Sequence, residues 1–293
     1  MNDALTVDKR LVRRAFEATA ATYDAAAVLQ NEVCRRMLAR LDYIKLDPAL
    51  ILDAGSGTGN AVAGLLSRRP RARVIALDLA LAMARRARAR RPWWRRLLDR
   101  NGSRLAAVCG DIEQVPLATG CAGMVWSNLA VQWVNEPQRA FAELHRVLAP
   151  GGLLLFSTFG PDTLKELRAS FQGVDRYTHV HRFVDMHDIG DTLVASGFAD
   201  PVMDMEVVTL TYDDVKGLMR DLKAIGAHNV TRGRPPGLAG KSLLARVARN
   251  YEAFRRDGKL PASFEVVYGH AWKSQPRVSP AGRPVFDIKP RNG

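Results

Sequence analysis

Four polar residues that could contact one ligand stand at the ends of four apolar runs. Asp53 ends ALILD, Asp78 ends ARVIALD, Asp111 ends RLAAVCGD and Asn128 ends AGMVWSN. Short apolar runs of this kind are typical of buried parallel strands, and most of the segments between them suit helices. Because the carboxyl ends of parallel strands meet in one crevice, we expect these four side chains to lie together although they are far apart in the sequence.

The loop after the first run contains three glycines in five positions, within DAGSGTG. Gly55, Gly57 and Gly59 lack Cβ atoms, so we expect a ligand to approach this backbone closely. A dinucleotide fingerprint would need glycine or alanine at position 60 or 62, where asparagine and valine stand, and no GKS or GKT phosphate loop is present. A ligand without a pyrophosphate is therefore indicated.

S-adenosylmethionine suits such a site, because it has no phosphate and carries a cationic amino acid end. Asp53 and the glycine loop would approach that end, and Asp78 would accept hydrogen bonds from the ribose diol. Asp111 would accept a hydrogen bond from the adenine amino group, with Leu79 and Ile112 packing on the base. The alternative interpretation is that Asp78 and Asp111 are only helix N-caps.

The core of the chain resembles the class I S-adenosylmethionine-dependent methyltransferases over residues 51–159. This resemblance rests on four motifs in the expected order, LDAGSGTG, IALDLA, CGDIEQVPL and WSNLAVQW. The flanking segments FEATAATYDAAAVLQ, STFGPDTLKEL and LPASFEVVYGHAWK are more specific. With them the chain is similar to the malonyl-[acyl-carrier protein] O-methyltransferase family over about residues 8–273, a family that begins pimeloyl synthesis for biotin.

The resemblance implies an α/β, Rossmann-like class I methyltransferase fold with a seven-stranded, mostly parallel sheet, an antiparallel edge and helical lid insertions. Residues 202–212 and 263–273 have the composition of the two strands at that edge. We expect a single methyltransferase domain at 1–273, followed by a disordered basic tail at 274–293. The expected parts of the domain are an N-terminal helical segment at 7–41, a cofactor-binding core at 49–159 and lid insertions at 161–201 and 213–261.

The implied reaction transfers a methyl group from S-adenosyl-L-methionine to the free carboxylate of malonyl-[acyl-carrier protein], giving S-adenosyl-L-homocysteine and a methyl ester. A carboxylate is already ionised at pH 7, so no catalytic general base is needed. The residues that we expect to position the substrate are Tyr23, Gln30, Trp133 and Arg182. The two aromatic residues could instead only fill the core, and Arg182 could form a surface salt bridge.

Other features exclude several classes of protein. No apolar segment is long enough for a membrane helix or resembles a signal peptide, so we expect a cytoplasmic protein. Three cysteines without a CxxC pair indicate neither a disulfide framework nor a zinc knuckle. We expect no metal at His179, His181 and His187, because the chemistry needs no Lewis acid and no HExxH spacing accompanies them.

The formal net charge of +13 is concentrated in patches. Nine arginines between residues 85 and 104 stand against one acid, and Lys9, Arg10, Arg13 and Arg14 crowd the N-terminal segment. An acidic acyl carrier protein that carries malonyl-phosphopantetheine would be attracted to either surface. The ordinary alternative is a solvated helix face whose arginine stems cover apolar surface.

Other functions share the same core motifs. A methyltransferase for another small acid, a quinone precursor or RNA would carry them, and so would a binding protein that no longer turns over its cofactor. Enzymes that methylate base nitrogens often have NPPY or DPPY after the fourth strand, whereas this chain has SNLAVQW. We therefore expect no nucleic-acid partner.

Overall fold

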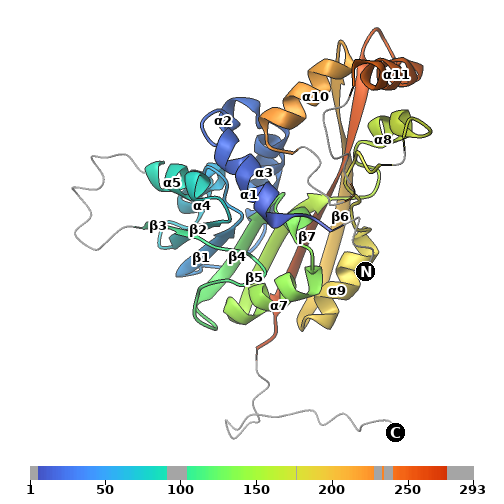
Figure 1. Ribbon diagram of the computed structural model, residues 1–293. Coiled ribbons are helices and arrows are strands. Elements are labelled where there is room, and N and C mark those ends of the chain that lie inside the picture. Colours follow the sequence, from blue (N-terminus) through green and yellow to red (C-terminus); the bar gives the residue numbers. More distant parts are fainter. Residues whose placement is uncertain (1–5, 91–103, 176, 228–232, 234–239, 276–293) are drawn as a thin grey trace, which may run out of the picture.

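The computed structural model describes residues 6–90, 104–175, 177–227, 233 and 240–275 (Figure 1). In these ranges the strands are β1 (Leu50–Ala54), β2 (Arg73–Asp78), β3 (Leu105–Cys109), β4 (Ala122–Asn128), β5 (Leu148–Phe159), β6 (Phe198–Tyr212) and β7 (Leu260–Lys273). They form one seven-stranded sheet in the order β3-β2-β1-β4-β5-β7-β6. Strand β7 is antiparallel to β5 and β6, and the other pairs are parallel. This confirms the predicted mostly parallel sheet with antiparallel pairing at one edge.

Helices connect and cover these strands. They are α1 (Lys9–Thr19), α2 (Tyr23–Ala26), α3 (Val28–Leu41), α4 (Asn60–Arg68), α5 (Leu81–Ala89), α7 (Pro137–Val147), α8 (Lys165–Phe171), α9 (Met186–Ala195), α10 (Val215–Ala224) and α11 (Lys241–Tyr251), with short 3-10 helices η2 (Val131–Trp133) and η3 (Glu252–Phe254). The N-terminal helical segment is divided into α1, α2 and α3, and the Asp8 side chain caps the first of these. Among the described residues, no helix is long and apolar enough to cross a membrane.

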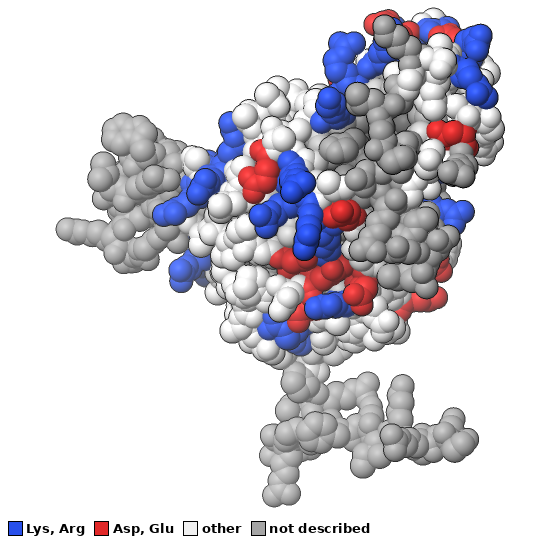
Figure 2. All heavy atoms as spheres, in the orientation of Figure 1, with Lys and Arg blue, Asp and Glu red and all other residues white. Residues whose placement is uncertain are grey.

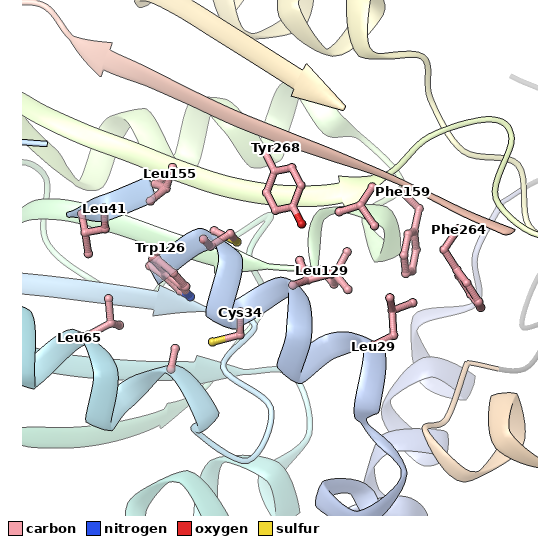
Figure 3. Packing of buried hydrophobic residues seen from close by; sticks show 14 of the residues in the cluster. Leu29, Cys34, Leu41, Leu65, Trp126, Leu129, Leu155, Phe159, Phe264 and Tyr268 are labelled. Carbon is pink, nitrogen blue, oxygen red and sulfur yellow. The ribbon is translucent and has the colours of Figure 1, made fainter. Parts of the chain in front are cut away.

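Helices bury both faces of the sheet. On one face α3 and α4 place Leu41 and Leu65 around Trp126 of β4, as Figure 3 shows. On the opposite face α7 and α9 contribute Phe141 and Ile189 to a second cluster. Because the central strands are enclosed from both sides, their sequences are apolar throughout and do not alternate with polar residues.

Strands β6 and β7 form an antiparallel pair that continues past the carboxyl end of β5. Strand β5 ends where Phe159 pairs with Val266, whereas β6 and β7 stay paired as far as Tyr212 and Leu260. Figure 1 shows α8, α10 and α11 gathered around the end of this strand pair that lies beyond β5. These helices from the two expected lid segments therefore lie beyond the carboxyl ends of the parallel strands.

One part of the expected lid insertion at 161–201 lies elsewhere. Helix α9 packs against α7 and β6, with Ile189 and Leu193 buried in the sheet core. Its apolar side chains find their contacts there, so this helix covers a face of the sheet and is not part of a lid. The tail expected at 274–293 lies outside the described residues from position 276 onward.

Candidate active site

A small cavity lies where the sequence predicts the cofactor, at the carboxyl ends of β1, β2 and β4. Its volume is about 80 Å³. The expected site residues that line it are Tyr23, Gly55, Gly57, Asp78, Leu79, Asp111, Ile112, Asn128 and Trp133. Asp53 and Gly59 do not line it. The structure thus brings together residues from the N-terminal helices, the glycine loop and three strand ends.

The three loop glycines have different reasons to lack a side chain. All have positive φ, but a Cβ at Gly55 would lie 2.2 Å from the Cβ of Ala130, and one at Gly59 would lie 2.9 Å from the Cα of Ala87. A Cβ at Gly57 would meet only Cε1 of Tyr23, at 3.9 Å. Gly55 and Gly59 therefore make room for neighbouring protein atoms, and the expectation that all three glycines also make room for a ligand stays a prediction.

The Asp78 carboxylate orders the glycine loop. Its Oδ2 accepts the N–H of Gly57 and its Oδ1 accepts the N–H of Ala80, both at 2.8 Å. Burial raises the pKa of Asp78 to about 6, although these two hydrogen bonds lower it. Ala80 occupies the N-cap position of α5, so Asp78 is not the cap. The carboxylate also lines the cavity and keeps free lone pairs for a ligand hydroxyl.

Asp53 lies directly behind the loop. Its side chain is 2% exposed, and its Oδ2 has no hydrogen-bond partner among the described residues. Burial, followed by the nearby charge of Asp78, raises the pKa of Asp53 to about 8. A buried carboxylate without a counter-charge is costly and favours a cationic ligand beside it.

Helix α1 forms a roof over the cofactor cavity. Lys9 donates to both carboxylate oxygens of Asp111 at 2.6 Å and also to Glu113. Val12 and Phe16 of the same helix line the cavity. Asp111 itself stands two residues past the end of β3, not at the strand end as expected. Sequence reasoning missed this roof because 102 positions separate the lysine from the carboxylate.

A polar network holds Tyr23 over the glycine loop. The buried Thr58 donates from its hydroxyl to Asp24, the neighbour of Tyr23. Arg90 joins the two by binding Asp24 at 2.7 Å and the Thr58 carbonyl at 3.0 Å. Burial, followed by the charges of Asp78 and Asp24, raises the pKa of Tyr23, so its hydroxyl stays protonated at pH 7. Tyr23 can therefore donate a hydrogen bond into the cavity.

A larger cavity adjoins the first beneath α8 and α10. Its volume is about 400 Å³, and Trp133 lines both cavities, so the two meet at this ring. Gln30, which we expected to position the substrate, lines it, and its buried Oε1 has no hydrogen-bond partner among the described residues. Most other lining side chains, such as Phe159 and Leu167, are apolar. The cavity can hold an extended organic group next to the cofactor.

The tip of β4 supports the junction between the two cavities. Asn128 donates through Nδ2 to the Gln30 carbonyl at 3.1 Å and accepts the Ser157 hydroxyl at 3.0 Å. Leu129 follows with a φ of 48°, a left-handed conformation that costs energy for a side chain of this size. Such strain is typical of functional sites, and Leu129 lines the cofactor cavity.

Arg182 does not line the larger cavity. It is exposed and lines a third cavity of about 230 Å³, between the segment around residue 182 and helices α7 and α9. His181, Gln132, Phe159 and Phe183 line both of these cavities and separate them. The expected contact of Arg182 with the substrate acid group is therefore not supported by its position.

The histidines near Arg182 have separate partners. His179 binds Asp175 and His187 binds Asp185, each with a closest distance of 2.8 Å. Within the described ranges, no three side chains of His, Cys, Asp or Glu come close enough to hold a metal ion.

Basic side chains gather on the face that carries the roof helix. Figure 2 shows them over α1, α5 and α10. The exposed basic residues on these helices are Arg10, Arg13, Arg14, Arg85, Arg86, Arg88, Lys216, Arg220 and Lys223. The arginines between 91 and 103 lie outside the described residues.

Known proteins share this fold. A family model described as "Methyltransferase domain" matches residues 52–156. The solved structure of the YcgJ protein from Bacillus subtilis covers 82% of this chain and 99% of its own, with a TM-score of 0.57 at 14% identity. A phosphoethanolamine N-methyltransferase from Haemonchus contortus, solved with S-adenosylhomocysteine, gives a TM-score of 0.51 at 17% identity and covers 90% of this chain and 60% of its own. At these identities the structures show the fold alone.

Closer relatives cover almost the whole chain. A malonyl-[acyl-carrier protein] O-methyltransferase from Gallionella capsiferriformans is 58% identical over 98% of both chains. One from Nitrosospira multiformis is 58% identical over 93% of this chain and 92% of its own. The chain belongs to the malonyl-[acyl-carrier protein] O-methyltransferase family.

Proposed function

We propose that this enzyme methylates the free carboxylate of malonyl-[acyl-carrier protein], giving the methyl ester that primes pimeloyl synthesis for biotin. The observation that carries the proposal is the apolar cavity of about 400 Å³ that meets the cofactor cavity at Trp133. Relatives at 55–58% identity share one name, which favours this substrate over another small acid, a quinone precursor or RNA.

The cofactor-binding residues fit S-adenosylmethionine. Asp78 would hold the ribose hydroxyls, and Asp111 would face the adenine amino group, with Leu79 and Ile112 beside the base. Asp53, buried without a counter-charge, suits the cationic end of the molecule. When bound, this cofactor supplies a methyl group on a positively charged sulfur, which an ionised carboxylate can accept with loss of both charges.

The substrate cavity favours such a loss of charge. Its walls are mostly apolar, and opposite charges that vanish during a reaction are least stabilised in apolar surroundings. No general base is required, because the acid group is ionised at pH 7. Gln30, Tyr23 and Trp133 would orient the carboxylate by hydrogen bonding and packing. None of the three is a cation that would pair with the carboxylate and weaken its nucleophilicity.

The partner would be an acidic carrier protein, and no nucleic acid is involved. The exposed arginines of α1 and α5 flank the cofactor cavity and would attract it. Arg182, at the third cavity, would contact the carrier protein or bind the phosphate of the phosphopantetheine arm. We place the reaction in the cytoplasm, because Cys34, Cys109 and Cys121 are all free.

Methyl-labelled S-adenosylmethionine tests the proposal. The enzyme is incubated with malonyl-carrier protein, free malonate, malonyl-coenzyme A or RNA, and incorporated label is counted. We expect strong labelling of the malonyl thioesters and little of malonate. Label on RNA alone, or on no malonyl thioester, would contradict the assignment.

A further inference from the structure

The large cavity contains two buried polar atoms without partners. In the described part of the chain seven buried side-chain polar atoms make no hydrogen bond, and two of them, Gln30 Oε1 and His181 Nδ1, belong to residues that line this cavity. Such orphaned atoms are rare in folded proteins and need an explanation. A bound ligand that donates a hydrogen bond to such an atom would account for it.

His181 lies next to Trp133 in the wall of the large cavity. Its ring stacks against Trp133 with centroids 6.4 Å apart and meets the edge of Phe183 at 5.3 Å. Because Trp133 borders the cofactor cavity, His181 lies one ring farther along the route of the substrate. It also lines the third cavity, so it stands at the boundary that a long substrate would cross on its way out of the large cavity.

The ring is neutral and presents a hydrogen-bond acceptor. Burial lowers the pKa of His181, and a main-chain hydrogen bond to Gln132 engages the ring. Nδ1 has no partner, so the ring nitrogen that binds Gln132 is Nε2. A neutral imidazole has one N–H and one lone pair, which leaves the lone pair on Nδ1. This lone pair needs a donor, and an ionised carboxylate has none.

We propose that His181 Nδ1 accepts a hydrogen bond from an amide N–H of the pantetheine arm that carries the acyl group. This inference rests on the proposed function. The first amide nitrogen of such an arm is about seven bonds from the reacting carboxylate oxygen, roughly 9 Å in an extended chain. This length suits a contact with His181, whose ring lies 6.4 Å from the ring of Trp133.

His181 would then distinguish a carrier-bound malonyl group from free malonate, which has no amide. Gln30, closer to the tip of β4, would be left to contact the acyl end. The site would recognise its substrate at two points, the acid through the Nε2 group of Gln30, which donates, and the arm at His181.

Equilibrium binding separates this role from a structural one. The enzyme is saturated with S-adenosylhomocysteine, which cannot donate a methyl group, and titrated calorimetrically with malonyl-pantetheine or with malonyl ethyl thioester, which lacks an amide. We expect His181→Phe to weaken binding of malonyl-pantetheine about fivefold to tenfold, the value of one hydrogen bond. Binding of the ethyl thioester should not change.

Two further variants serve as controls. Asn keeps an acceptor atom near the position of Nδ1, so His181→Asn should restore most of the affinity for malonyl-pantetheine. His187→Phe removes an exposed histidine of the same region and should change neither binding constant. Affinity for S-adenosylhomocysteine should stay constant in all three variants, which shows that the fold is intact.

Some results would overturn the inference. Equal weakening of both thioesters by His181→Phe would mean that the ring only packs, and unchanged binding of both would mean that it does not contact the arm. If the wild-type enzyme binds and methylates malonyl-pantetheine, either result refutes the inference about His181 and leaves the proposed function standing. If the wild-type enzyme binds neither thioester, the proposed function fails and the inference fails with it.

Discussion

The contrast between two loop glycines predicts different effects of the same substitution. Gly55 and Gly57 both have positive φ, at 78° and 53°, so an alanine at either position carries the left-handed penalty of roughly 1–2 kcal/mol. At Gly55 the new methyl group would also lie 2.2 Å from the Cβ of Ala130, which cannot rotate away. Such overpacking adds about 1–3 kcal/mol. We expect Gly55→Ala to lower the free energy of unfolding by about 2–5 kcal/mol and Gly57→Ala by about 1–2 kcal/mol.

The Gly57 substitution, which costs less stability, should affect ligand binding directly. A methyl group at Gly57 meets only Tyr23 and extends into the cofactor cavity. Gly57→Ala should therefore weaken binding of S-adenosylhomocysteine at least tenfold, or about 1.4 kcal/mol, in a protein that remains folded. Urea unfolding followed by tryptophan fluorescence measures the stabilities, and calorimetry measures the binding. Equal loss of stability in the two variants, or wild-type affinity in Gly57→Ala, would refute the reasoning.

Four further predictions address the roof, the buried acids, the basic surface and Arg182. Lys9→Met leaves two carboxylates without their counter-charge, so stopped-flow measurements should show S-adenosylhomocysteine dissociating several-fold faster, with roughly 1–3 kcal/mol lost in stability. The pKa values of Asp53, about 8, and Asp78, about 6, are raised, so the folded state binds protons more tightly than the unfolded state. The free energy of unfolding without cofactor should therefore fall as pH rises from about 4 to 8. Asp53→Asn should flatten this decline. Turnover of malonyl-carrier protein should fall steeply with salt, and Arg13→Glu should reproduce much of the loss at low salt. Arg182→Leu should raise the KM for malonyl-carrier protein several-fold and leave the affinity for S-adenosylhomocysteine unchanged.

Each of these has a contrary outcome. An unchanged dissociation rate in Lys9→Met would mean that α1 does not close the cofactor cavity. A stability that rises between pH 6 and 8 would mean that Asp53 is ionised in the ligand-free protein. Turnover that is insensitive to salt would make the arginines of α1 an ordinary solvated surface. Kinetics of Arg182→Leu identical to wild type would remove Arg182 from the route of the substrate.

The sequence predicts the sheet and the cofactor cavity well because both depend on local patterns. The apolar runs that end at Asp53, Asp78 and Asn128 identify three of the strand ends correctly, and strand ends of a parallel sheet must converge. Asp111 was placed at a strand end only because its run continues without a polar break, whereas the strand stops two residues earlier. The glycine spacing excluded a pyrophosphate but could not reveal that Gly55 and Gly59 face Ala130 and Ala87, which are distant in sequence.

The substrate side of the site is much less predictable. Lys9 gave no signal beyond its charge, because its partners lie more than a hundred positions away. In the sequence His181 is notable only as one of three neighbouring histidines, since burial and an unpartnered nitrogen cannot be read from THVHRF. Arg182 was chosen for its charge, and the structure places it at the neighbouring cavity. These contacts depend on how the lid segments fold over the sheet, which local patterns do not determine.

Tandem mass spectrometry of the product tests the central claim most directly. The enzyme is incubated with malonyl-carrier protein and S-adenosylmethionine, and the detached acyl-pantetheine is fragmented to locate the added methyl group. The account predicts a methyl ester on the carboxyl group distal to the thioester. A methyl group on any other atom, or none at all from an enzyme that binds S-adenosylhomocysteine, would contradict it.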